Sequence, residues 1–122
     1  VEQMKKLAWR VERKKAIWRR YARGLAGLSA FRLFDHDLER TSPWFIDSLC
    51  ERREGLIAHL KAAGIGSRVM YPPINAQEAY REPGSFPVSE RVGREGLWLP
   101  SASQLSDEQI DAICAEIRAY YS

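Results

Sequence analysis

Apolar side chains recur every three or four positions along the first part of the chain, with polar and basic residues between them. The residues that keep this spacing are Met4, Leu7, Val11, Trp18, Tyr21, Leu25 and Leu28. The spacing predicts one long amphipathic helix over about residues 2–26, with Gly24 and Gly27 at its end. At about 1.5 Å per residue this helix would be roughly 37 Å long, so we expect it to connect two bodies.

Short segments of a different pattern follow. Four of them are rich in apolar, aromatic or branched residues and predict strands: residues 31–34, 44–50, 66–71 and 97–99. Helical spacing returns over residues 53–63, with Gly64 as a left-handed cap, and over residues 87–95, where Pro87 suits the first turn. A helical turn is expected over residues 76–81.

The clearest helix start lies near the end of the chain. Ser106 and Gln109 have the spacing of a capping box. Leu105 and Ile110 are placed as the hydrophobic staple of the same motif. The buried stripe of this helix is expected to be Ile110, Ile113, Cys114, Ile117 and Tyr121.

The order of these elements predicts an α+β fold, a small sheet with flanking helices. We expect residues 1–28 to form an interdomain connecting helix and residues 29–122 to form a small α/β domain. The order and direction of the strands do not follow from the sequence.

Composition narrows the class of protein. The chain has 122 residues, 45% of them hydrophobic and 29% charged, which is typical of one globular domain and not of a disordered chain. No apolar run is long enough to cross a membrane. Lys5, Lys6 and Arg10 interrupt any signal-peptide core, and two cysteines do not make a disulfide framework, so a cytoplasmic location is expected.

The charge is unevenly distributed. Residues 1–23 hold nine basic and two acidic residues, whereas the rest of the chain is mildly acidic. One interpretation is a module that binds nucleic acid or another polyanion, with affinity that falls steeply with salt. The other is a solvated helix face, or a face that lies against an acidic neighbouring domain.

Residues that could carry catalysis are few. The side chains suited to a metal site or a Cys–His nucleophile pair are His36, Cys50, His59 and Cys114, whose positions favour core or surface roles. Gly64 and Gly66 lack the third glycine of a dinucleotide fingerprint and follow a helix. Asp107 and Glu108 lie in the first turn of a helix, where acids favour the helix dipole. We therefore assign no metal site and no catalytic residue.

The segment Gly66-Ser67-Arg68-Val69-Met70-Tyr71-Pro72-Pro73-Ile74-Asn75 is the best candidate for a binding site. The guanidinium of Arg68 matches phosphate or carboxylate oxygens, and Tyr71 offers a ring face and a hydroxyl. A stiff loop at the end of a strand often binds ligands. The alternative is that Arg68 pairs with a surface acid while Tyr71 is half-buried packing.

This segment, together with Ile65, is similar to a stretch of the DegT/StrS-type family of nucleotide-sugar aminotransferases. Further stretches resemble that family in the same order along essentially the whole chain: Val1-Glu2-Gln3-Met4, Leu56-Ile57-x-x-Leu60 with Gly64-Ile65, Phe86-Pro87-Val88-Ser89-Glu90, Gly96-Leu97-Trp98-Leu99-Pro100 and Leu105-Ser106-Asp107-Glu108-Gln109. Within the family the chain looks closest to the perosamine synthase branch, which transaminates a GDP-linked 4-keto-6-deoxy sugar in polysaccharide or O-antigen biosynthesis.

The resemblance implies a homodimeric pyridoxal 5'-phosphate enzyme of the aspartate-aminotransferase fold (type I), with glutamate as amino donor. It implies that this chain is only the C-terminal small domain, and that the Schiff-base lysine and the other cofactor-binding residues lie upstream of Val1. The lysines of the chain, Lys5, Lys6, Lys14, Lys15 and Lys61, match no such motif. We therefore expect the chain alone to bind no cofactor and to be inactive. A family sugar dehydratase remains an alternative.

The resemblance also implies roles for individual residues. We expect Tyr71 to pack against the substrate, Arg68 to support or contact an anionic group, and Asn75 to be a third substrate-binding candidate. Trp44 matches an aromatic position of the core. The basic face of the first helix would then lie against the missing catalytic domain.

A chain that lacks its neighbouring domain should expose apolar surface. The candidates are the stripe of Trp9, Ile17 and Trp18, and the loop around Pro72. We expect the isolated chain to self-associate.

Overall fold

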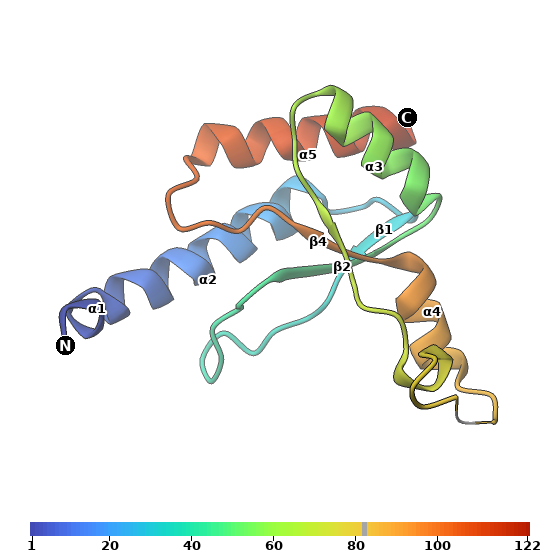
Figure 1. Ribbon diagram of the computed structural model, residues 1–122. Helices are drawn as coiled ribbons and strands as arrows, with labels where there is room; N and C mark the ends of the chain where they lie inside the picture. Colours follow the sequence, from blue (N-terminus) through green and yellow to red (C-terminus); the bar gives the residue numbers. More distant parts are fainter. Residues whose placement is uncertain (82) are drawn as a thin grey trace.

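The computed structural model describes residues 1–81 and 83–122. The helical elements are α1 (Glu2–Lys5), α2 (Leu7–Gly24), α3 (Arg53–Ala62), the 3₁₀ turn η1 (Ile74–Ala76), α4 (Pro87–Glu95) and α5 (Asp107–Tyr121). The strands are β1 (Phe31–Leu33), β2 (Ile46–Cys50), β3 (Arg68–Val69) and β4 (Gly96–Leu99). In Figure 1, α3 and α5 lie along one side of the strands, and α4 lies at the end of the molecule away from the N-terminus. This arrangement confirms the predicted α+β class.

The strands form one antiparallel sheet in the order β1-β2-β4-β3. Side chains alternate between the two faces of a strand, so Leu97 and Leu99 point into the core while Trp98 points to the other face. The register places Asp47 of β2 and Arg68 of β3 on either side of Trp98. We call the face that carries these three residues the open face, because α2, α3 and α5 pack on the opposite one.

The core lies between the sheet and the three helices α2, α3 and α5. Its fully buried large side chains are Ile17, Tyr21, Ile46, Leu56, Leu60, Leu97, Ile110 and Ile117. Tyr21 also donates its hydroxyl to the carbonyl of Pro100 at 2.9 Å, which ties α2 to the end of β4. The stripe predicted for the last helix lies in this core except for Tyr121, which is half-buried.

The single N-terminal helix predicted over residues 2–26 is wrong, because the chain forms two helices there. Lys6 separates them with φ −97° and ψ 1°, outside the helical region. Met4 and Leu7, which we expected on the buried stripe, are exposed. This end projects beyond the sheet in Figure 1, and Leu7 lines an open hollow with Pro43 and Trp44 instead of entering the core.

Two glycines near the end of α2 have different roles. Gly24 belongs to the helix, where a β-carbon would lie 2.6 Å from the sulfur of Cys114, so glycine permits the close approach of α2 and α5. Gly27 takes a φ of +81°, which a residue with a β-carbon rarely adopts, and turns the chain toward β1.

Most other predicted bounds agree with the structure to within one or two residues, and the exception is one strand. The strand expected over residues 66–71 is limited to Arg68–Val69, because β4 is short and pairs only two of its residues with this segment. The helical turn expected over residues 76–81 is present in part, because the N–H groups of Tyr80 and Arg81 both donate to the carbonyl of Gln77 at 3.0 Å. A separate 3₁₀ turn at Ile74–Ala76 precedes it. By contrast, Pro87–Glu95 forms the helix that its sequence predicts, with the proline at the first turn.

The predicted exposure of the large apolar residues is partly wrong. Trp44, expected in the core, is 78% exposed, because it precedes β2 and its ring contacts only the edge of Phe45 among the aromatic side chains described. Ile17, expected at the surface, is fully buried because it lies on the side of α2 that faces the sheet. Trp9 is 57% exposed as expected, and Trp18 is half-buried.

Within residues 1–81 and 83–122, no helix has both the length and the apolar character needed to span a bilayer.

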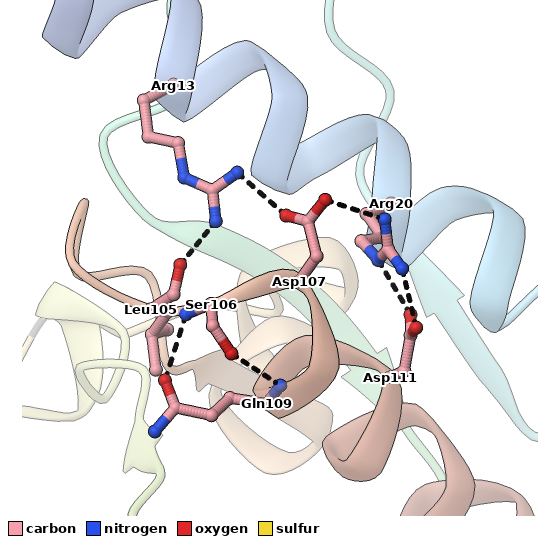
Figure 2. Close-up of polar contacts among 7 residues, drawn as sticks. All are labelled: Arg13, Arg20, Leu105, Ser106, Asp107, Gln109 and Asp111. Atoms are coloured by element: carbon pink, nitrogen blue, oxygen red, sulfur yellow. Dashed lines mark hydrogen bonds and ion pairs between the residues drawn. The ribbon is translucent and has the colours of Figure 1, made fainter.

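An ion-pair network joins α2 to the start of α5 (Figure 2). Arg13 donates to Asp107 Oδ1 at 2.8 Å and to the carbonyl of Leu105. Arg20 donates to Asp107 Oδ2 at 2.8 Å, and it holds Asp111 with two hydrogen bonds of 2.7 and 2.6 Å. Two residues of the basic helix thus have their acidic partners within this chain.

This network predicts a loss of stability in acid. Hydrogen bonds from Arg13 to Asp107 and from Arg20 to Asp111 hold the pKa of each carboxyl below its ordinary value of 3.8. The stabilisation is therefore present above that value and is lost as pH falls through the folded-state pKa. Because both groups are exposed, we expect a modest effect that salt weakens.

The measurement is the urea midpoint between pH 6 and pH 2, in low and high salt. Asp111→Asn should flatten the acid limb of that profile, whereas the control Glu39→Gln, at an exposed acid outside the network, should leave it unchanged. An unchanged acid limb in Asp111→Asn would contradict the prediction.

The capping box predicted at the start of α5 is confirmed. The backbone N–H of Gln109 donates to Ser106 Oγ at 3.2 Å, and the side-chain oxygen of Gln109 accepts from the backbone N–H of Ser106 at 2.9 Å. We expect Ser106→Ala to lower the free energy of unfolding by about 1 kcal/mol in urea titrations, and Ser106→Asp to restore most of it. Equal losses in both variants would contradict this prediction, because aspartate should still cap the helix.

Candidate functional site

Trp98 of β4 lies at the centre of the open face, among side chains from β2, from β3, from the loop before β2 and from the loop after β3. Its ring stacks on Phe45, with centroids 4.5 Å apart and planes 17° apart. The ring of Tyr71 meets it nearly at right angles, with centroids 5.3 Å apart. The indole N–H donates to Asp47 Oδ1 at 2.7 Å. We call these four residues and Arg68 the open-face cluster.

Arg68 is held by aromatic rings. Its guanidinium carbon lies 5.8 Å from the ring centroid of Tyr71 and 6.0 Å from that of Trp98, within the range of cation–π attraction. The surface acid that we considered as a partner is not found among residues 1–81 and 83–122. Arg68 and Tyr71 are exposed, and the alternative of a half-buried Tyr71 is wrong because its side chain is 66% exposed.

The structure brings together two of the three substrate-binding candidates. Arg68 and Tyr71 share the open-face cluster, whereas Asn75 lies in η1 and lines a separate hollow of about 430 Å³ beside the start of α4. The other residues of this hollow are Ile74, Tyr80, Phe86 and Ser89. Asn75 would therefore contact a ligand in this hollow and not at the open-face cluster.

Asp47 and its neighbours Phe45 and Trp98 are site residues that we did not predict from the sequence. A signal was present, because Trp98 alternates with Leu97 and Leu99 and so had to face away from the core. Without the strand order, however, nothing showed that Asp47 and Arg68 would flank it.

His36 lies at the border of the same region. Its Nε2 is 3.6 Å from Asp47 Oδ2 and has no hydrogen-bond partner among the described residues. Its ring meets that of Trp18 edge-on, with centroids 5.9 Å apart.

The remaining nucleophilic and metal-binding side chains are occupied or buried. Burial raises the pKa of Cys50 to about 12 and that of Cys114 to about 11, so both stay protonated at neutral pH and are poor nucleophiles. His59 contacts Glu116 at 2.9 Å on the surface of α3 and α5. The described part of the chain has no group of three metal-ligating side chains.

The DegT/DnrJ/EryC1/StrS aminotransferase family matches residues 1–118 of this chain. The chain belongs to this family.

Its curated relatives agree with that assignment. GDP-perosamine synthase of Escherichia coli O157:H7 is 31% identical over 116 residues, which cover 92% of this chain and 32% of the relative. The erythromycin biosynthesis sensory transduction protein EryC1 of Saccharopolyspora erythraea is 38% identical over 94 residues, which cover 67% of this chain and 25% of the relative. The chain thus spans about a third or less of the length of these relatives.

Solved structures share the fold. A DegT DnrJ EryC1 StrS aminotransferase from Brucella abortus superposes with a TM-score of 0.89 at 31% identity, over 99% of this chain and 34% of that one. S. venezuelae DesV, solved in complex with a ketimine intermediate, gives a TM-score of 0.90 at 30% identity, over 98% of this chain and 34% of that one. The family and the type of fold implied by the sequence resemblance are therefore confirmed.

Family members are pyridoxal-phosphate-dependent sugar aminotransferases, and three of the five lysines of this chain have partners within it. Lys14 is partly buried, which lowers its pKa, but its amine donates to the carbonyls of Trp44 and Ser101. Lys5 and Lys15 pair with glutamates of their own helices. Lys14 therefore links the loops that contain Trp44 and Ser101 to α2. We assign no step of transamination to a residue of this chain.

Proposed function

We propose that this chain is the C-terminal small domain of a pyridoxal-phosphate-dependent aminotransferase that acts on a nucleotide-linked 4-keto-6-deoxy sugar. Residues 1–28 connect it to a catalytic domain upstream, and residues 29–122 form one wall of the active site. The amino donor is glutamate and the enzyme is a homodimer. The chain alone binds no cofactor and is inactive, because the reactive lysine belongs to the catalytic domain.

The match over residues 1–118 to a sugar aminotransferase family carries this proposal. The sugar class rests on relatives from two species that are named GDP-perosamine synthase. The separate domain rests on the relatives' length, since each is about three times as long as the aligned segment.

Within this proposal, Arg68 and Tyr71 of the open-face cluster contact the sugar nucleotide, and Arg68 binds its anionic part. Arg68 supplies a guanidinium whose fork of donors matches phosphate oxygens, and the rings of Tyr71 and Trp98 give it a fixed support. Tyr71 is exposed enough to pack against the sugar or base. Asn75 contacts a more distant part of the substrate from η1.

The cytoplasm remains the proposed location. Both cysteines are free thiols in the core, as expected of a protein that folds in a reducing compartment.

The basic N-terminal helix supports a polyanion-binding alternative less than its composition suggests. Arg13 and Arg20 are engaged by acids of α5, and Lys15 lies 3.5 Å from Glu12. Retention on heparin that falls steeply with salt would favour this alternative.

The test uses the natural-length protein that contains these residues. Borohydride reduction should fix pyridoxal on a lysine outside residues 1–122, as shown by peptide mass spectrometry. Incubation with glutamate and GDP-, dTDP- or UDP-linked 4-keto-6-deoxy sugars should yield an amino sugar nucleotide, whereas the 122-residue chain should yield none. Loss of water without amination would indicate a dehydratase, and the absence of any cofactor-dependent reaction would overturn the proposal.

A further inference from the structure

Asp47 has an unusual place on the open face. It is an acid at a position where its side chain is only 28% exposed, and no described lysine or arginine pairs with it. Its two oxygens have different neighbours: Oδ1 accepts the indole N–H of Trp98 at 2.7 Å, and Oδ2 lies 3.6 Å from His36 Nε2. Burying part of a carboxylate costs free energy unless the carboxylate has hydrogen-bond partners. The hydrogen bond from the indole N–H therefore indicates that Asp47 has a specific role toward Trp98.

The sheet register extends this contact to the substrate-binding candidates. Asp47 lies directly opposite Trp98 on β2, and Arg68 lies directly opposite Trp98 on β3. Opposite residues of adjacent antiparallel strands are in direct side-chain contact range. A carboxylate, an indole and a guanidinium thus form one row across three strands.

The contacts of Trp98 fix the plane of its ring. Phe45 stacks on the ring and Asp47 holds the N–H, so rotation of the ring would break a hydrogen bond and a stack together. The orientation of the indole in turn sets the surface that Arg68 and Tyr71 contact. A ring without the hydrogen bond would support both side chains less firmly.

We infer that Asp47 is a positioning residue, which holds Trp98 and thereby places Arg68 and Tyr71 for the anionic group of the substrate. This inference rests on the proposed function. Asp47 itself does not touch the substrate, and His36 serves as its second neighbour. Asparagine at this position can accept the indole N–H with its oxygen, while alanine cannot.

The kinetic test uses the natural-length holoenzyme and four variants: Asp47→Ala, Asp47→Asn, Trp98→Phe and the double variant of Asp47→Ala with Trp98→Phe. Loss of the hydrogen bond should raise KM for the sugar nucleotide about fivefold to tenfold in Asp47→Ala and in Trp98→Phe, with kcat within about twofold. Asp47→Asn should restore most of the affinity. The double variant should be no worse than either single variant, because both remove the same contact.

Additive losses in the double variant, or equal losses in Asp47→Asn and Asp47→Ala, would overturn the inference. A fall in kcat without a change in KM would also do so, because a positioning role for binding does not predict it.

A spectroscopic measurement separates this inference from the proposed function. In nitrogen-15 spectra of the same protein, Asp47→Ala should shift the indole N–H signal of Trp98 and the Nε–H signal of Arg68, and Asp47→Asn should return both. The control Glu108→Ala should move neither. If the wild-type protein aminates no sugar nucleotide, the proposed function fails, yet these spectra still decide the inference: an unmoved Arg68 signal overturns it.

Discussion

Replacing Tyr21 with alanine should lower the free energy of unfolding by about 3–5 kcal/mol, as removal of large buried aromatic side chains does elsewhere. Tyr21 is fully buried between α2, α5 and the sheet. The change removes a whole ring from the core and leaves the carbonyl of Pro100 without its donor. For a domain whose total stability is about 5–15 kcal/mol, such a loss is a large share.

Two further variants divide this effect into its parts. Tyr21→Phe keeps the ring and removes only the hydroxyl, so it should cost about 1 kcal/mol. Tyr80→Ala removes an equal side chain that is 64% exposed, and it should change stability by less than about 0.5 kcal/mol.

Urea titrations of the three variants at pH 7 give the free energy of unfolding and the slope of its dependence on urea concentration. Burial also raises the pKa of Tyr21 well above its ordinary value, as expected of a phenol enclosed in the core. A cost for Tyr21→Ala no larger than that for Tyr80→Ala would mean that α2 does not belong to the cooperative core.

Local chemistry explains which elements could be predicted. The capping box of Ser106 and Gln109 and the helix that begins at Pro87 depend on neighbours within one turn, and both are found where the sequence places them. The helical position of Gly24 depends on its close approach to Cys114 of a distant helix, and the break at Lys6 has no counterpart in the apolar spacing of the sequence. No local pattern contains that information.

The candidate site shows the same division. Arg68 and Tyr71 could be predicted because both residues and the prolines after them lie in one short segment of the sequence. Trp98 and Asp47 could not, since they join that segment only through the order β2-β4-β3. The core position predicted for Trp44 is wrong for a related reason. An aromatic residue suggests burial in the core, but Trp44 lies in the loop before β2, which leaves its ring exposed.

Arg68→Ala should have the largest effect on the proposed activity, an increase of about tenfold to a hundredfold in KM for the sugar nucleotide, as expected for the loss of hydrogen bonds to a charged group. The structure supports this size because Arg68 is exposed on the open face, next to the rings of Tyr71 and Trp98. Its contacts with these rings lie at the exposed surface, where cation–π attraction is weak, so the urea midpoint should change little. The kcat should also stay within about threefold, since the residue binds and does not react.

Two arginine substitutions make this prediction specific. Arg68→Lys keeps the charge but loses the planar fork of donors, so its KM should lie between those of wild type and Arg68→Ala. Arg32→Ala removes a charge from β1, at the far edge of the same sheet, and should leave KM within about twofold. If Arg32→Ala raised KM as much as Arg68→Ala, the general charge of the sheet would be responsible and the open-face cluster would not be the binding site. If both left KM unchanged while the enzyme remained active, the substrate would contact another face of this domain, and the hollow beside Asn75 would become the better candidate.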